Sequence, residues 1–321
     1  MSSVLSDRHF HDEAAAYRFV EKRVWPNGPV CPHCGGVERI SPMKGKSTRI
    51  GTYKCYQCRK PFTVKVGTIF ESSHVKMHLW LQAIFLIASS KKGISANQLH
   101  RTLGVTLKTA WFMAHRIRES MRDGGLGPLG GEGKIVEADE TYYGQKEGPA
   151  PTTTTSGRPF TKKGKGGPSH KRAILSLVER GGSVRTFHVA QANKVNVTDL
   201  VNQNVARESI LMTDESRLYG DMKHVFERHL STKHRAGEYV RYENGLAIHS
   251  NTVENYFSVF KRGMRGTYQH CAEKHLHRYL AEFDFRYNRR VSLGVNDEAR
   301  AGQILDGITG KRLTYETAQA R

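Results

Sequence analysis

Three carboxylates that are far apart in the sequence lie on segments able to bring them together. Asp139 lies in the strand-like stretch 134–143, Asp214 follows the apolar segment Ile210–Thr213, and Glu254 lies near the start of a predicted helix. Converging carboxylates hold hard divalent cations, and two such ions about 3.5–4 Å apart can serve both the attacking and the leaving oxygen in phosphoryl transfer. Without metal these acids would repel one another and raise each other's pKa. They therefore indicate a site for two Mg²⁺ or Mn²⁺ ions.

Two of these acids have neighbours that compete for the same role. Glu140 follows Asp139, and Glu215 follows Asp214. Because adjacent side chains in a strand point to opposite faces, we expect only one of each pair to face the site. Taken singly, each acid is more often a surface carboxylate. The order Asp, Asp, Glu on a strand, a strand end and a helix favours the metal site.

A lysine seven residues after Glu254 adds a candidate phosphate-binding group. Lys261 lies on nearly the same face of the predicted helix and about 10 Å along it. In this arrangement Glu254 would bind the metal ions, and Lys261, two turns further along the helix, would bind a phosphate of the substrate. Arg262 and Arg265 follow it in a basic run, and all three cations are expected to contact DNA. The alternative is that Lys261 is only a surface lysine of this run.

Four of the five cysteines form two CxxC pairs separated by 20 residues, namely Cys31, Cys34, Cys55 and Cys58. Two tight turns that each present two thiolates can complete a tetrahedron around one structural Zn²⁺ ion. A redox dithiol needs only one pair, so zinc is favoured over a redox motif or a chance pairing. His33 is not needed as a ligand. Cys271 is interpreted as an ordinary small residue.

The segment from Gly93 to Met121 predicts a helix-turn-helix. Ser95 and Thr106 can cap its two helices, and Gly104 permits the turn between them. The second helix has an apolar face and, on another side, a basic face that would enter the major groove of DNA. The basic face comprises Lys108, Trp111, His115, Arg118 and Arg122. The alternative is a plain helical hairpin that packs against its neighbours.

The composition predicts a nucleic-acid partner. The chain has 50 Lys and Arg against 30 Asp and Glu, a net charge of +20 that attracts polyanions. A solvated basic surface or an RNA-packing protein is the alternative. The apolar stretch Leu79–Ala88 is too short for a membrane span, and Met1–His11 shows no signal-peptide core. With its paired CxxC motifs, the chain is expected to act in the reducing cytoplasm, on DNA and away from membranes.

The 321 residues fit two or three domains. A zinc ribbon is expected at 15–70, a helix-turn-helix domain at 74–122, a glycine-rich linker at 123–133, and a tail at 291–321. Between linker and tail, three strands, a helix, a strand and further helices predict a mixed α/β sheet at 134–290. A basic insertion at 144–168 interrupts it. Four of its cations are expected to follow the DNA backbone, namely Arg158, Lys162, Lys163 and Lys165.

Four separated motifs resemble those of bacterial insertion-sequence transposases of the IS-fifteen-ninety-five group. They are Trp25–Gly35 (WPNGPVCPHCG), Val136–Gly144 (VEADETYYG), His249–Phe257 (HSNTVENYF) with Lys261–Gly263, and Leu276–Arg290. Members pair a small zinc ribbon with an RNase H-like α/β domain, a mixed sheet with flanking helices. The family's catalytic Asp, Asp, Glu and following Lys would correspond to Asp139, Asp214, Glu254 and Lys261. The insertion at 144–168 is longer than the usual loop of the family.

The resemblance implies a DDE transposase that cuts and joins double-stranded DNA with Mg²⁺. Terminal inverted repeats of the element would be bound by the ribbon and the helix-turn-helix. Because two element ends must be joined to one target, a homodimer or larger assembly is expected. Two alternatives remain: an RNase H-like nuclease or junction resolvase without strand transfer, and a transcription regulator that uses only the DNA-binding segments.

Overall fold

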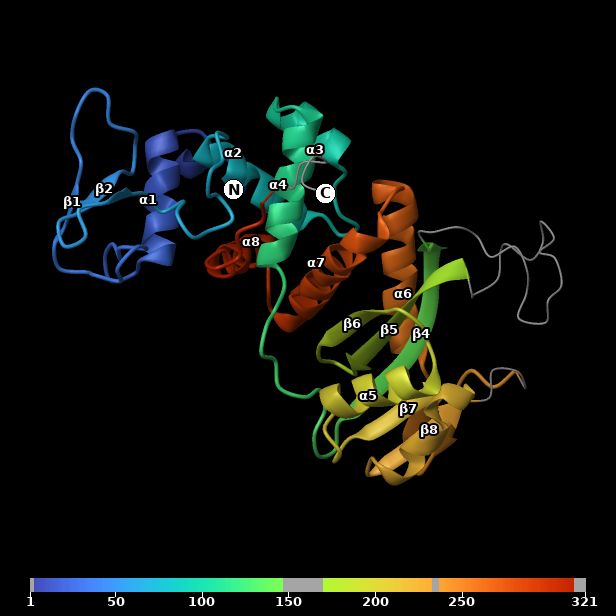
Figure 1. Cartoon of the computed structure of the whole chain (residues 1–321). Helices are drawn as coiled ribbons and strands as arrows, with labels where there is room; N and C mark the ends of the chain where they lie inside the picture. Colours follow the sequence, from blue (N-terminus) through green and yellow to red (C-terminus); the bar gives the residue numbers. More distant parts are fainter. Residues whose placement is uncertain (1–2, 147–169, 233–236, 315–321) are drawn as a thin grey trace. The chain divides into compact units, whose positions relative to one another are not determined.

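The computed structural model describes residues 3–146, 170–232 and 237–314 (Figure 1). The chain forms two compact units. One consists of Met1–Asp123 with Arg289–Arg321, and the other of Gly124–Asn288. Four cations of the basic insertion lie outside the described residues, namely Arg158, Lys162, Lys163 and Lys165.

A five-stranded mixed sheet forms the centre of the second unit. Its strands are β4 (Ile135–Gln145), β5 (Lys171–Glu179), β6 (Val184–Val189), β7 (Ile210–Asp214) and β8 (Arg228–Thr232), in the order β6-β5-β4-β7-β8. The pairs β4–β5 and β5–β6 are antiparallel, whereas β4–β7 and β7–β8 are parallel. The long central strand β4 therefore borders both the antiparallel meander and the parallel half, which is the RNase H-like arrangement expected from the sequence.

Helices cover both faces of this sheet (Figure 1). Helix α5 (Lys194–Asn204) and the 3-10 helix Arg217–His224 contribute to one core, together with Val136, Ala138 and Leu175 of the sheet. On the other face, Ile174 and Val178 pack with the helices that follow. These are α6 (Asn251–Gly263), a π-helical turn (Met264–Tyr268), a 3-10 turn (Glu273–His275) and α7 (Leu276–Asn288). A hairpin of β9 (Arg241–Glu243) and β10 (Leu246–Ile248) leads into α6.

The first unit combines a small sheet with a helical group. Helix α1 (Glu13–Val24) precedes the antiparallel strands β1 (Ile40–Pro42), β2 (Tyr53–Cys55) and β3 (Pro61–Phe62). The remaining helices are α2 (Met77–Ser89), α3 (Ala96–Leu103), α4 (Leu107–Ser120) and α8 (Asp297–Asp306), with short 3-10 turns at Val4–Ser6, Arg8–Phe10 and Val291–Leu293. Over the described ranges, every helix is too short or too polar to cross a bilayer.

The helix-turn-helix has the capping that its sequence predicts. Ser95 accepts a hydrogen bond from the backbone of Gln98, and Thr106 from that of Thr109. Gly104 ends α3 with φ +65°, a left-handed conformation that favours glycine. The apolar face of α4 is buried as expected, and its members are Ala110, Met113, Ala114, Ile117 and Met121.

The predicted basic face of α4 needs correction at two positions. His115 is 0% and Arg118 is 2% exposed, so neither side chain lies on the surface. The helix is therefore buried over a wider arc than its apolar residues alone indicate. Lys108 and Arg122 are exposed, and Trp111 is half-buried. Only part of the expected DNA-reading surface is therefore accessible.

The C-terminal segment, expected to be a weakly patterned tail, contains α8, which packs mainly against α2. Asn296 caps this helix, and Ile304 and Leu305 are buried. The buried Arg300 donates to the carbonyl oxygen of Ala88, at the end of α2. The periodicity of α8 is difficult to recognise in the sequence because a buried arginine occupies one of the core positions.

Candidate functional site

An acidic cluster lies where strand β7 ends beside the longer strand β4. Carboxylate oxygens of Asp139, Glu140 and Asp214 all lie within 4.8 Å of one another. The paired register of β4 and β7 stops at Glu137 and Met212, and β7 itself ends at Asp214. The sheet is therefore open on that side of β4, directly beside Asp139.

The expectation that Glu140 would point away from the site is wrong. Glu140 lines the same cleft as Asp139, and its carboxylate accepts hydrogen bonds from Tyr219 (2.8 Å) and Ser216 (3.4 Å). The two side chains do leave opposite faces of β4. Because no neighbouring strand separates the faces beyond the end of β7, both carboxylates still reach the same space.

Burial and like charges make Asp139 a weak acid. Burial, together with the negative charges of Glu140, Asp214 and Glu254, raises its pKa to about 8. The backbone N–H of Glu140 donates to Asp139 at 2.8 Å, which acts in the opposite direction. A carboxylate whose ionisation is this costly is what a cation site requires, because a bound divalent ion compensates the repulsion.

We predict that Asp139→Asn stabilises the protein when no Mg²⁺ or Mn²⁺ is added. The pKa of Asp139 is about 8 in the folded chain, against about 4 for an unfolded aspartate, so folding becomes less favourable as pH rises between these values. At pH 7 the cost reaches up to about 4 kcal/mol. Thermal unfolding at pH 5 and pH 7.5 should show that the Tm advantage of the variant grows with pH. An advantage that is constant or shrinks would contradict the assigned pKa.

Helix α6 and the π-helical turn after it bring a fourth carboxylate and three cations to the cleft that Asp139 lines. Glu254 lies in the first turn of α6, and Lys261 two turns later. Both line a cleft of about 580 Å³ together with Asp139 and Glu140. Arg262 and Arg265 line it as well. The ammonium of Lys261 lies 5.9 Å from the ring centre of Phe257. The cleft thus contains both carboxylates and cations, a combination suited to a phosphate group next to metal ions.

Burial lowers the pKa of Lys261, while the charge of Asp139 raises it. The charge of Lys261 therefore interacts with that of Asp139. Glu254 is not among the three acids whose oxygens lie within 4.8 Å of one another. From the sequence we expected Asp139, Asp214 and Glu254 to form one cluster of metal ligands. The structure brings Asp139, Glu140 and Asp214 together, and Glu254 lies outside this tight group, in the cleft that Asp139 and Glu140 also line.

Sequence reasoning missed Glu137, which is fully buried. Its carboxylate accepts hydrogen bonds from the backbone N–H groups of Thr252 and Val253, in the first turn of α6. One signal was available. Glu137 stands between the apolar residues Val136 and Ala138 and two positions before Asp139. A carboxylate in so apolar a strand must find partners in the protein interior.

The residues of the cluster fit hard divalent cations. Mg²⁺ and Mn²⁺ are bound by carboxylate oxygens, and Mg²⁺ usually keeps part of its water shell. Asp139 and Asp214 supply such oxygens from neighbouring strands, and Glu140 or Glu254 can supply a third. Burial and repulsion already make Asp139 hard to ionise without a cation.

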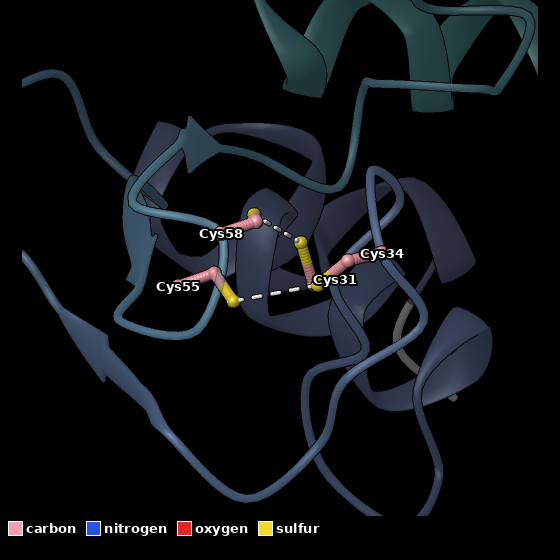
Figure 2. Close-up of side chains that lie close together, drawn as sticks. All are labelled: Cys31, Cys34, Cys55 and Cys58. Atoms are coloured by element: carbon pink, nitrogen blue, oxygen red, sulfur yellow. Dashed lines mark hydrogen bonds between the residues drawn. The ribbon is translucent and has the colours of Figure 1, made fainter.

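The four cysteines of the two CxxC pairs converge in the first unit (Figure 2). Their sulfur atoms all lie within 4.8 Å of one another. The Sγ atoms of Cys31 and Cys58 are 3.6 Å apart, and those of Cys34 and Cys55 are 3.7 Å apart. A tetrahedron with Zn–S bonds of about 2.3 Å has edges of about 3.8 Å. The thiols are thus spaced as a Zn²⁺ site requires.

Backbone geometry prepares these thiols for a metal. Gly35 and Arg59, each directly after the second cysteine of a pair, have φ of 72° and 61°. Backbone N–H groups of Cys58 and Gln57 donate to the sulfur of Cys55 and lower its pKa to about 7. Such turns expose N–H groups to thiolates and favour the ligand form. Burial and the three neighbouring thiols instead raise the pKa of Cys34 to about 12, so Cys55 is the thiol that ionises more readily of the two. Around the cluster pack the aromatic rings of Trp25, Tyr53 and Phe62.

The strand order and the acidic cluster define an RNase H-like domain, and the chain joins this domain to a ribbon in which four cysteine thiols converge. Comparisons with known proteins agree. Residues 128–288 match the model of the ISXO2-like transposase domain, and residues 11–61 match that of a transposase zinc-ribbon domain. An "Uncharacterized protein in transposable element ISH50" of Halobacterium salinarum is 27% identical over 282 residues, which cover 86% of this chain and 91% of the relative.

A solved structure, "Crystal structure of the Mos1 Strand Transfer Complex", matches with a TM-score of 0.28 and 13% sequence identity, over 70% of this chain and 72% of that one. So distant a match identifies no individual residue. The domain match spans half of the sequence, and the chain belongs to the ISXO2-like transposase family. It is a DNA transposase.

Proposed function

We propose that the protein cleaves DNA at the ends of an insertion sequence and joins the freed 3′ ends to target DNA. The observation that carries this proposal is the position of Asp139 and Asp214. Their carboxylate oxygens lie within 4.8 Å of each other at the open side of β4. Asp139 also lines the cleft that contains Lys261, and both aspartates belong to a domain of a transposase family. Asp139, Asp214 and Glu254 are the proposed ligands of two Mg²⁺ or Mn²⁺ ions. When bound, the ions would activate the attacking oxygen and stabilise the leaving one.

The residues of the cleft divide the remaining tasks. Lys261 and Arg265 would bind phosphates of the DNA strand on either side of the scissile bond, while the exposed Arg262 extends the positive surface. Ionised carboxylates alone would repel the phosphate, so these cations are needed to hold it beside the acids. The N–H of Ser216 donates to Asp214 at 2.9 Å and fixes its orientation. Tyr219 and Ser216 restrain Glu140 in the same way.

The DNA-binding role is proposed for the segments before the catalytic domain. The ribbon at 15–70 and the helix-turn-helix at 74–122 would bind the terminal inverted repeats, with 134–290 as the catalytic domain. Lys108 and Arg122 are the accessible cations of the proposed surface, with Trp111 between them. We also propose that the cations of the insertion contact the DNA backbone. Joining two element ends to one target requires at least two catalytic sites, hence a dimer or larger assembly.

The test is a joining assay with the full chain. A labelled duplex that ends with the element's terminal repeat is incubated with supercoiled plasmid and Mg²⁺ or Mn²⁺. We expect label to become covalently attached to the plasmid, because the freed 3′-hydroxyl attacks it. Cleaved ends that never join would instead favour a nuclease or junction resolvase. A gel shift without any cleavage would favour a transcription regulator.

A further inference from the structure

The fully buried Glu137 links the strand that carries Asp139 to the helix that carries Glu254. One of its oxygens, Oε2, accepts hydrogen bonds from the backbone N–H groups of Thr252 (2.8 Å) and Val253 (3.0 Å). The other, Oε1, accepts from the hydroxyl of Thr252 at 2.8 Å. The first N–H groups of a helix have no partner within the helix and attract negative charge. Glu137 therefore caps α6 from the sheet.

The ordinary capping residue of α6 has a different task. Ser250 occupies the N-cap position, yet its side chain makes no capping hydrogen bond. Its hydroxyl instead donates to the carboxylate of Glu254 at 3.2 Å. Since Glu137 satisfies the helix N–H groups, Ser250 can orient Glu254. The two contacts together fix both the helix and the acid that it presents.

A half-buried arginine balances the charge of Glu137. The Nε atom of Arg180 lies 2.6 Å from Oε1 of Glu137. Its other nitrogens donate to the carbonyl oxygens of Ala247 and His249, in the segment that leads into α6. The guanidinium thus restrains the approach to the helix, and the carboxylate restrains its first turn. A fully buried carboxylate is tolerated only when it is paired and hydrogen-bonded in this way.

We propose that Glu137 is a positioning residue that sets the distance between the metal-binding acids of the sheet and Glu254. This inference rests on the proposed function of the acidic cleft. Asp139 lies two residues after Glu137 on the same face of β4, and Glu254 directly follows Val253. The connection between the two ligands therefore runs through the hydrogen bonds of Glu137. Metal sites need such support, since their ligands must be held within about 0.5 Å of the binding geometry.

The test compares Mn²⁺ binding by the wild-type full chain and by Glu137→Gln, which keeps the shape but directs an amide NH₂ or a weaker acceptor at the helix. Two Mn²⁺ midpoints are measured for each variant. The first is the Mn²⁺ concentration that gives half of the maximal rise in Tm without DNA. The second is the Mn²⁺ concentration that gives half of the maximal rate of DNA cleavage. We expect an increase of about 10- to 100-fold for Glu137→Gln, the usual effect of losing a residue that orients metal ligands. Glu137→Asp, which keeps the charge, should lie in between.

The matched control is Glu282→Gln. Glu282 is also fully buried beside an arginine, Arg286 of α7. Its replacement should lower the Tm but leave the Mn²⁺ midpoint unchanged. If Glu137→Gln behaves like this control, its role is structural only and the inference is wrong.

Should Glu137→Gln fail to fold, Thr252→Val answers the same question, because it removes only the hydroxyl hydrogen bond to Glu137. We expect a smaller shift of the midpoint in the same direction, and an unchanged midpoint would overturn the inference. The Mn²⁺ titration without DNA separates this result from the proposed function. A wild-type chain that binds Mn²⁺ but never cleaves DNA would contradict the proposed function, while the comparison of midpoints would still decide the role of Glu137.

Discussion

Replacing Asp139 or Asp214 by asparagine is expected to reduce metal-dependent DNA cleavage by at least about a thousandfold. Each substitution removes an anionic ligand from a cluster whose carboxylates lie within 4.8 Å of one another. Several kcal/mol of transition-state stabilisation depend on the bound ions, and each 1.4 kcal/mol is worth a factor of about ten in rate. The rates of end cleavage are to be measured with Mg²⁺ and with Mn²⁺.

Binding of element-end DNA should survive both substitutions, because the DNA-binding surface is proposed to lie on other segments. The matched control is Asp221→Asn, an aspartate in the same unit whose side chain is 62% exposed and pairs with Lys194. It should leave the rate unchanged. Substantial cleavage by Asp139→Asn, at more than a few per cent of the wild-type rate, would show that the site is assigned wrongly. Combined with the expected rise in Tm, the result separates a lost ligand from a damaged fold.

The same assay decides which glutamate is the third ligand. Glu254→Gln is expected to lose as much activity as the aspartate variants, because Glu254 shares the cleft with Lys261 and is oriented by Ser250. Glu140→Gln should lose about tenfold or less, since the Glu140 carboxylate already accepts hydrogen bonds from Tyr219 and Ser216. The reverse order would assign the third position to Glu140.

The sequence predicted the architecture well where the pattern is local. Strand β7 ends at Asp214, directly after the predicted apolar segment, and α6 begins at Asn251, so that Glu254 lies near the start of its helix as expected. The caps of α3 and α4 at Ser95 and Thr106 follow from residue type alone. Strand β8 was missed, because Arg228–Thr232 is polar and does not alternate. It joins the sheet through parallel pairing with β7, a long-range contact that leaves little trace in its own residues.

The site was predicted less completely than the fold, for a physical reason. The alternation of side chains along β4 predicts that Asp139 and Glu140 point to opposite faces of the strand. It does not predict that β7 ends at Asp214, which lets both carboxylates reach the same site. Glu137 has partners 115 and 116 residues away in the sequence, at the start of α6. His115 and Arg118 show the same limit in another helix. Residue type suggests an exposed basic face, whereas tertiary packing buries both side chains.

The zinc ribbon should lose its fold when one ligand is removed. Its described core consists of few residues, with Cys31, Cys55 and Phe62 buried and Trp25 and Tyr53 packed against them. So small a core contributes little stability, whereas structural zinc sites contribute apparent free energies of about 10–16 kcal/mol at neutral pH. We predict that the wild-type chain binds one Zn²⁺ ion and that Cys34→Ser binds less than a tenth as much after dialysis. Limited proteolysis should then cut the variant within residues 25–66.

Loss of zinc should weaken DNA-end binding without abolishing the chemistry of the acidic cleft. We expect the affinity for the terminal repeat to fall at least about tenfold in Cys34→Ser, equivalent to about 1.4 kcal/mol or more. The Mn²⁺-dependent rise in Tm, which reports the cleft, should remain because the acids lie in the other compact unit. Cys271→Ser is the matched control, since Cys271 belongs to that unit and lies outside the four-cysteine cluster. It should keep both zinc and affinity. A Cys34→Ser chain that retains a protease-resistant ribbon would show that packing of the aromatic rings, rather than the metal, holds the segment together.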